Sequence, residues 1–219
     1  MAQSGFKFVA ADDRQSIVGP GFRLTFARSG ERWTHALAIG DGPAHVLNGI
    51  ACAIEGDPER DDPRRVVSPA YQEIQPHPNE QGICLLLTGM ATPHHFSTVV
   101  VARRVKDRLT IAVDLADRCR APIDILAATY TVQLGSSDLI DASSERIVWG
   151  GDALGQGRLE FAADARDSVA LSEAGRRATR VQALAAIDPS TYTQRLRYQW
   201  TWTPPESPRA VAGPVPERP

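Results

Sequence analysis

Apolar and polar side chains alternate along residues 94–134 in a pattern that predicts three consecutive β-strands. Residues 96–103 are rich in β-branched side chains, which favour strands. In residues 109–115, four aliphatic side chains fall at every second position, so they share one face of a strand. The alternation returns in residues 126–134 after a break at 117–122. The stretch therefore predicts an antiparallel meander with one buried and one more polar face.

Other parts of the chain predict further short strands, separated by glycine, proline and charged residues. They fall at residues 6–10, 22–26, 33–39, 45–48, 50–54, 66–74, 83–88, 146–149, 159–163 and 192–202. Residues 75–79 contain two prolines and predict an edge strand or a loop, because proline cannot donate to a sheet. Residues 55–65 predict an exposed charged loop. Residues 169–187 fit both a helical spacing and an alternation, and we favour a strand there.

These elements predict an all-β protein with little helix. The chain has about fourteen strand candidates, roughly twice the seven of a simple immunoglobulin-type sandwich. A large antiparallel β-sandwich of two packed sheets accounts for this pattern better than an α/β fold does. We expect residues 1–203 to form a single β-sandwich domain. Six prolines fall in residues 204–219, so we expect that segment to be a proline-rich disordered tail.

Composition and charge exclude several classes of protein. The net charge of -2 offers no bulk attraction to nucleic acid or to an anionic membrane surface. No apolar run reaches the roughly 18 residues of a membrane span, and no phosphate-binding glycine-rich loop or nucleophile elbow is present. The three cysteines show no metal or redox spacing. We therefore expect no cofactor, no metal and no nucleic-acid or membrane partner, and a cytoplasmic location.

The order of the predicted strands resembles that of the galactose-mutarotase-like β-supersandwich. The resemblance is carried by residues 22–26, 33–39, 108–114 and 121–128. In that family a long strand is often followed by a loop and then by a strand that begins with a small residue and a proline, as residues 121–128 do here. Aldose epimerases and domains of many carbohydrate-active enzymes share this fold, so the resemblance implies a supersandwich-like architecture and a carbohydrate ligand.

The resemblance does not extend to the epimerase catalytic residues. Aldose epimerases of that family use a histidine as general acid and a late glutamate as general base. In this chain the late glutamates Glu160 and Glu173 lie in no recognisable motif. Phe96 follows the histidine pair His94 and His95 where the family has a proline and an aromatic residue.

His94, His95 and Glu73 are the candidates for acid–base catalysis. An imidazole and a carboxylate could move a proton on a sugar if the fold brought them together. Neighbouring side chains on a strand point to opposite faces, so His94 and His95 should not bind one metal ion. The alternative is that the two histidines simply lie where a strand begins.

Tyr71, His77, Arg118 and Trp33 are the candidates for ligand binding. Exposed tryptophans can stack on sugar rings, whereas tryptophans on alternating strands are more often core residues, and we expect Trp200 and Trp202 to be core. The acids Asp114, Asp117 and Asp124 lie near Arg118 around a predicted turn. They could form a glycosidase pair, but exposed ion pairs are the more common arrangement.

Three functions remain open at the level of sequence. The favoured one is a carbohydrate-binding or carbohydrate-recognising β-sandwich without enzymatic activity. The second is an epimerase or lyase that acts on a sugar or uronate. The third is a structural or assembly domain that binds another protein chain, including a second copy of itself in a homo-oligomer.

Overall fold

The computed structural model describes residues 6–39, 52–55, 62–79, 82–134, 138–151, 154, 156–173 and 178–205. Strands make up 71% of the described residues and helix 1%, which confirms the all-β prediction. The strands form one sheet of nine strands and another of eight. The two sheets pack against each other as a β-sandwich.

The nine-stranded sheet is antiparallel apart from one short parallel pairing. Its order is β1-β2-β3-β4-β5-β11-β16-β15, and β6 pairs in parallel with β11. The bounds are β1 Lys7–Ala11, β2 Arg14–Gly19, β3 Phe22–Ser29, β4 Arg32–Ile39, β5 Cys52–Glu55, β6 Arg65–Val66, β11 Ile125–Gln133, β15 Ser168–Glu173 and β16 Ala178–Leu184.

The eight-stranded sheet is antiparallel throughout and contains the predicted central strands. Its order is β12-β13-β14-β17-β10-β9-β8-β7. The bounds are β7 Glu73–Asn79, β8 Gly82–Ala91, β9 His94–Val105, β10 Arg108–Arg118, β12 Asp138–Ala142, β13 Arg146–Gly150, β14 Arg158–Ala163 and β17 Thr193–Thr203.

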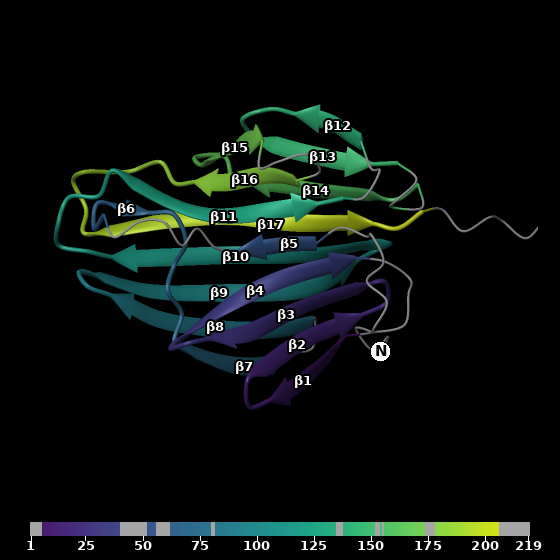
Figure 1. Ribbon diagram of the computed structural model, residues 1–219, viewed down its shortest axis with the longest axis horizontal. Helices are drawn as coiled ribbons and strands as arrows, with labels where there is room; N and C mark the ends of the chain where they lie inside the picture. Colours follow the sequence, from purple (N-terminus) through teal and green to yellow (C-terminus); the bar gives the residue numbers. More distant parts are fainter. Residues whose placement is uncertain are drawn as a thin grey trace, which may run out of the picture.

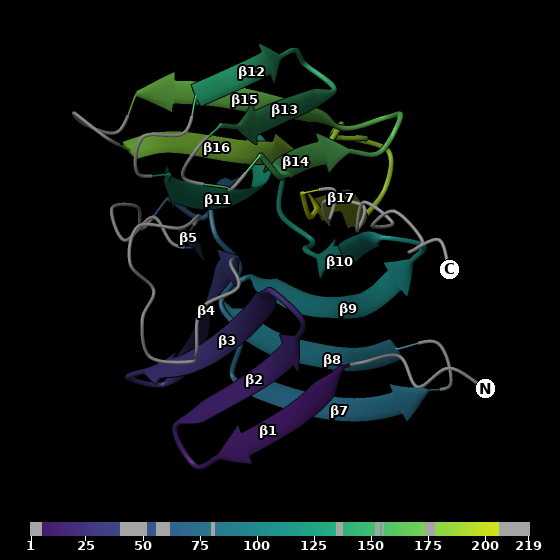
Figure 2. The same cartoon turned by 90° about the vertical axis from the view of Figure 1, so that its right-hand side faces the viewer.

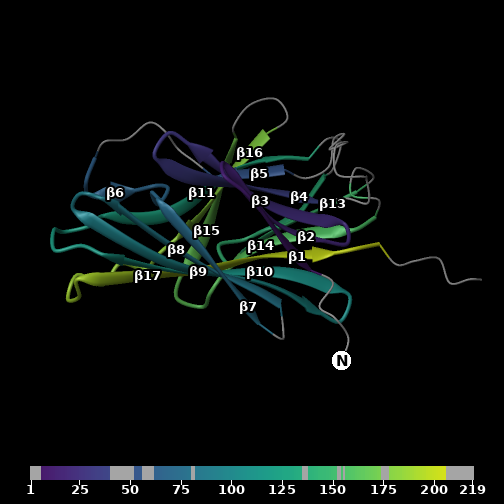
Figure 3. The same ribbon diagram turned by 90° about the horizontal axis from the view of Figure 1, so that it is seen from below.

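The two sheets form two layers, which can be followed in the three views of the molecule (Figure 1, Figure 2 and Figure 3). Figure 1 and Figure 2 show β1 to β4 lying over β7 to β9. In the view from below, β5, β11 and β16 occupy one layer while β9, β10 and β17 occupy the other (Figure 3). Alternate side chains of each sheet therefore point into a shared core.

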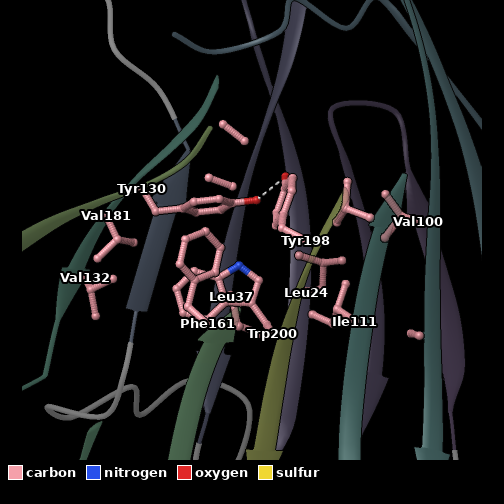
Figure 4. Close-up of a cluster of buried hydrophobic side chains, with 14 of the residues drawn as sticks. Leu24, Leu37, Val100, Ile111, Tyr130, Val132, Phe161, Val181, Tyr198 and Trp200 are labelled. Carbon is pink, nitrogen blue, oxygen red and sulfur yellow. Dashed lines mark hydrogen bonds between the residues drawn. The ribbon is translucent and has the colours of Figure 1, made fainter. Parts of the chain in front are cut away.

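Aromatic side chains fill the centre of this core. Tyr130 of one sheet meets Phe161, Tyr198 and Trp200 of the other, with ring centroids 5.2–6.0 Å apart (Figure 4). The Tyr130 hydroxyl lies 2.7 Å from the Tyr198 hydroxyl and 2.9 Å from Nε2 of His35. These bonds satisfy hydroxyl groups that water cannot reach, and they join the two sheets.

Several predicted elements are confirmed. β10, β11 and β17 coincide with the alternating stretches, and residues 75–79 lie in β7, the edge strand of its sheet. The ambiguous segment 169–187 contains β15 and β16 and no helix among its described residues. The strand expected at 45–48, most of the charged loop and the tail from residue 206 lie outside the described residues.

The pairing of β10 with its neighbours sets the register of the outward face. A two-residue turn at Lys106 and Asp107 joins β9 to β10 and places His95 opposite Arg118. On the other side of β10, Asp114 lies opposite Arg197 of β17. Side chains that are far apart in sequence thus become neighbours on the surface of the eight-stranded sheet.

Candidate functional site

A groove of about 460 Å³ crosses the outward face of the eight-stranded sheet. Outward-facing side chains of β9, β10, β14 and β17 contribute most of its lining. They include the apolar Val99, Val101, Ala112 and Ala162, and the polar Asp114, Arg197 and Gln199. Asp164, which directly follows β14, also lines the groove. The small alanines on neighbouring strands leave space between taller side chains. A mainly apolar concavity with a few polar groups is the usual form of a small-molecule site.

A network of ion pairs fixes the positions of the charged side chains on the polar side of the groove. Asp114 Oδ1 accepts a hydrogen bond from Arg195 Nε at 2.7 Å, and Asp114 Oδ2 accepts one from Arg197 Nε at 3.2 Å. Arg197 Nη1 also lies 3.6 Å from Oδ2 of Asp164. The hydrogen bond from Arg195 is the largest cause that lowers the pKa of Asp114 below its ordinary value. Asp114 is therefore a carboxylate at neutral pH.

This network supplies oriented hydrogen-bonding groups rather than a catalytic base. Both oxygens of Asp114 are already occupied by guanidinium groups, and its lowered pKa makes it a weak proton acceptor. The guanidinium groups keep N–H groups that Asp114 does not use. The side-chain amide of Gln199, on the same strand, forms no hydrogen bond with any residue that the structure describes. The groove can therefore offer donors and acceptors to hydroxyl groups.

His94 forms a buried pair with Asp117 on the inward, core-facing side of the eight-stranded sheet. Its Nδ1 lies 2.8 Å from Asp117 Oδ2, and its Nε2–H donates to the Pro63 carbonyl at 2.7 Å. Burial lowers the pKa of His94, but the bonds to Asp117 and Pro63 outweigh burial and raise it above the ordinary value of 6.5. Both ring nitrogens thus serve to fasten the segment around Pro63 to β9 and β10.

The structure separates the three candidate catalytic residues. His94 is 3% exposed, whereas His95 is exposed on the opposite face of β9, as the alternation predicts. Glu73 lies on β7, two strands away from β9, and accepts a hydrogen bond from Thr88 Oγ1 at 3.3 Å. No acid–base pair forms among His94, His95 and Glu73.

The candidate ligand-binding residues divide between the surface and the core. Arg118 is exposed beside His95, and His77 is exposed on β7. Trp33 is only 6% exposed and its indole donates to the Gln72 carbonyl at 3.2 Å. Tyr71 is 2% exposed, and its hydroxyl lies 2.9 Å from Thr98 Oγ1. Trp33 and Tyr71 therefore pack in the core instead of reaching a surface ligand, and both belong to the cluster of buried hydrophobic side chains.

The acids around the predicted turn also divide. Asp114 and Asp124 form exposed ion pairs, the latter with Arg64 at 2.7 Å, in agreement with the commoner arrangement. Asp117 departs from it, because its side chain is 0% exposed and pairs with His94. Trp200 and Trp202 are 3% and 5% exposed, which confirms them as core residues.

The groove residues Arg197 and Gln199, and Arg195 beside them, are absent from the candidates chosen from sequence. They form the polar half of the alternation in β17, whose aromatic half drew attention to the core. The cationic and polar side chains at alternate positions of β17 are the feature of the sequence that could have indicated this site. Its pairing with Asp114 depends on β10, which lies about 80 residues earlier, so the sequence alone gives no register.

Within the described ranges, no group of three or more histidine, cysteine, aspartate or glutamate side chains could hold a metal ion. No helix in the described part of the chain is long and apolar enough to cross a membrane. Cys84 and Cys119 are free thiols.

Comparisons with known proteins reveal similarity of fold alone. No protein-family model and no curated protein matches this chain. The crystal structure of a mutant of the heparan sulfate lyase HepC from Pedobacter heparinus matches with a TM-score of 0.52 and 10% sequence identity. The match covers 94% of this chain and 36% of the lyase chain. The β-sandwich thus corresponds to about a third of that longer enzyme.

Proposed function

We propose that this protein is a carbohydrate-recognising β-sandwich that binds a saccharide in the groove on its eight-stranded sheet. The groove is the observation that carries the proposal, because it joins an apolar floor to oriented polar groups. The Asp114 network fixes those groups before a ligand arrives, which reduces the ordering cost of binding. The likeness to a heparan sulfate lyase supports a carbohydrate ligand.

The proposal assigns no catalytic activity to the described residues. His94 uses both ring nitrogens for internal contacts, and Asp114 is bound by two arginines. An epimerase or lyase would need a free acid or base beside the substrate. We further propose that residues 1–203 act as one supersandwich-like domain, in keeping with the resemblance of its strand order to the galactose-mutarotase-like fold.

A calorimetric titration of the full chain against a panel of neutral and acidic oligosaccharides tests this function. Ala112→Phe places a ring in the floor of the groove and should weaken saccharide binding at least about tenfold, which equals 1.4 kcal/mol. Ala27→Phe is the matched control, because Ala27 is a half-buried alanine on β3 of the other sheet.

Unchanged saccharide binding by the Ala27→Phe variant together with weakened binding by the Ala112→Phe variant would support the groove as the saccharide site. Circular dichroism would verify that both variants keep their strands. No heat of binding across the whole panel, or equal affinity of the two variants, would reject the proposed function.

A further inference from the structure

Positive charge is concentrated on the outward face of the three central strands of the eight-stranded sheet. The outward positions of β9, β10 and β17 carry five arginines, Arg103, Arg108, Arg118, Arg195 and Arg197, against one acid, Asp114. The whole chain has a net charge of -2, so this excess is a local property of the face. On the next strand, the charges of Arg158 and Glu160 cancel.

Much of this charge is available to a ligand. Asp114 pairs with Arg195 and Arg197, and Asp164 pairs with Arg197 as well, so the charge left over lies mainly on the other arginines of the face. Arg118 and Arg103 are exposed and form no ion pair with any described residue. Arg195 uses two of its five N–H groups on Asp114 and keeps the others.

Three of these arginines, Arg197, Arg195 and Arg118, follow a line that leaves the groove. Arg197 lies opposite Asp114, and Arg118 lies four residues further along β10. At about 3.3 Å per residue, Asp114 and Arg118 are about 13 Å apart along β10. Arg195 lies between them on β17, and His95 flanks the line on β9. A chain lying along it would meet cationic side chains at successive points.

We infer that the saccharide recognised by this face is anionic and carries carboxylate or sulfate groups along its length. Arginine binds both groups through paired hydrogen bonds of matching geometry. The inference rests on the proposed function and adds the chemical class of the ligand. The anionic groups meet Arg118, Arg195 and Arg197, while the sugar ring occupies the apolar groove.

The same face is poorly suited to nucleic acid. Its outward positions on β9, β10 and β17 contain no phenylalanine, tyrosine or tryptophan. Single-stranded nucleic acids are usually held by bases stacked on aromatic side chains. A saccharide needs no such stack if its charges are bound.

Calorimetric titrations of the full chain with four probes test the inference. The probes are an oligogalacturonate, a heparin oligosaccharide, a neutral cello-oligosaccharide and a single-stranded oligonucleotide. At least one acidic saccharide should bind more tightly than the neutral one, and its affinity should fall as salt is raised. The first two probes separate carboxylate from sulfate as the preferred group.

Arg118→Gln removes a charge at the far end of the line and should weaken acidic saccharide binding about fivefold, as expected for one exposed ion pair. Arg14→Gln, at an exposed arginine of β2 on the other sheet, is the control and should bind like the unaltered protein.

The outcomes separate this inference from the function on which it rests. Equal or tighter binding of the neutral probe would overturn the inference and leave the saccharide function standing. Tighter binding of the oligonucleotide would overturn the inference, as would identical affinities for the Arg118→Gln and Arg14→Gln variants. Failure of every saccharide to bind would reject both proposals.

Discussion

Replacing His94 with leucine should destabilise the protein strongly, because it strands a buried carboxylate. The side chains of His94 and Asp117 are 4% and 0% exposed. Oδ1 of Asp117 has no hydrogen-bond partner among the described residues, so the carboxylate depends on His94. Breaking a buried pair by removing one partner costs about 3–5 kcal/mol. We expect a loss of that size in the free energy of unfolding.

Urea denaturation followed by tryptophan fluorescence measures this loss, and two further variants sharpen it. His95→Leu changes the neighbouring exposed histidine and should alter stability by less than about 0.5 kcal/mol. The double variant His94→Leu with Asp117→Leu should recover much of the loss, because replacing both charges with apolar groups is often close to neutral.

The same pair gives the protein a defined pH dependence. The folded-state pKa of His94 is raised above its ordinary value of 6.5, so the folded protein holds the His94 proton more tightly than the unfolded chain. Stability from His94 is therefore complete below pH 6.5 and is lost as the pH rises through the folded-state pKa. The His94→Leu variant should lack this decline. In the urea experiment, equal losses in the free energy of unfolding for His94→Leu and His95→Leu would contradict the buried pair of His94 and Asp117.

Two other changes test the packing of the sandwich, each by urea denaturation. Tyr130→Phe removes the hydroxyl between His35 and Tyr198 and should cost about 1–3 kcal/mol, whereas no change would show that the hydroxyl cluster does not join the sheets. Gly89→Ala places a Cβ against the backbone carbonyl of Ala70 and should cost about 1–3 kcal/mol through overpacking, whereas a neutral effect would contradict the close approach of the two backbones.

The strands could be predicted because their alternation is local. Leucine, isoleucine and valine at every second position of β10 carry the signal within one strand, and the aromatic residues of β17 do the same. Residues 169–187 were ambiguous because an alanine-rich segment satisfies both periods. Packing decides the matter, since Val181 and Ala183 are fully buried against the core.

The register of the strands decides which site residues become neighbours. The sequence indicates that register for a hairpin but not for strands far apart in the chain. The two-residue turn between β9 and β10 fixes their pairing and places Asp117 near His94, so hairpin geometry could have found this pair. The ion pairs of Asp114 with Arg195 and Arg197 require β10 to lie beside β17. No local pattern specifies that long-range neighbour, and the groove that it creates was not predicted.

Backbone amide shifts measured by NMR during a titration with oligogalacturonate would locate the ligand on the fold. We expect the largest changes at residues 99–101 of β9, 112–114 of β10 and 197–199 of β17, which surround the groove. Shifts confined to the nine-stranded sheet, or spread evenly over both sheets, would contradict a saccharide site on the outward face of the eight-stranded sheet.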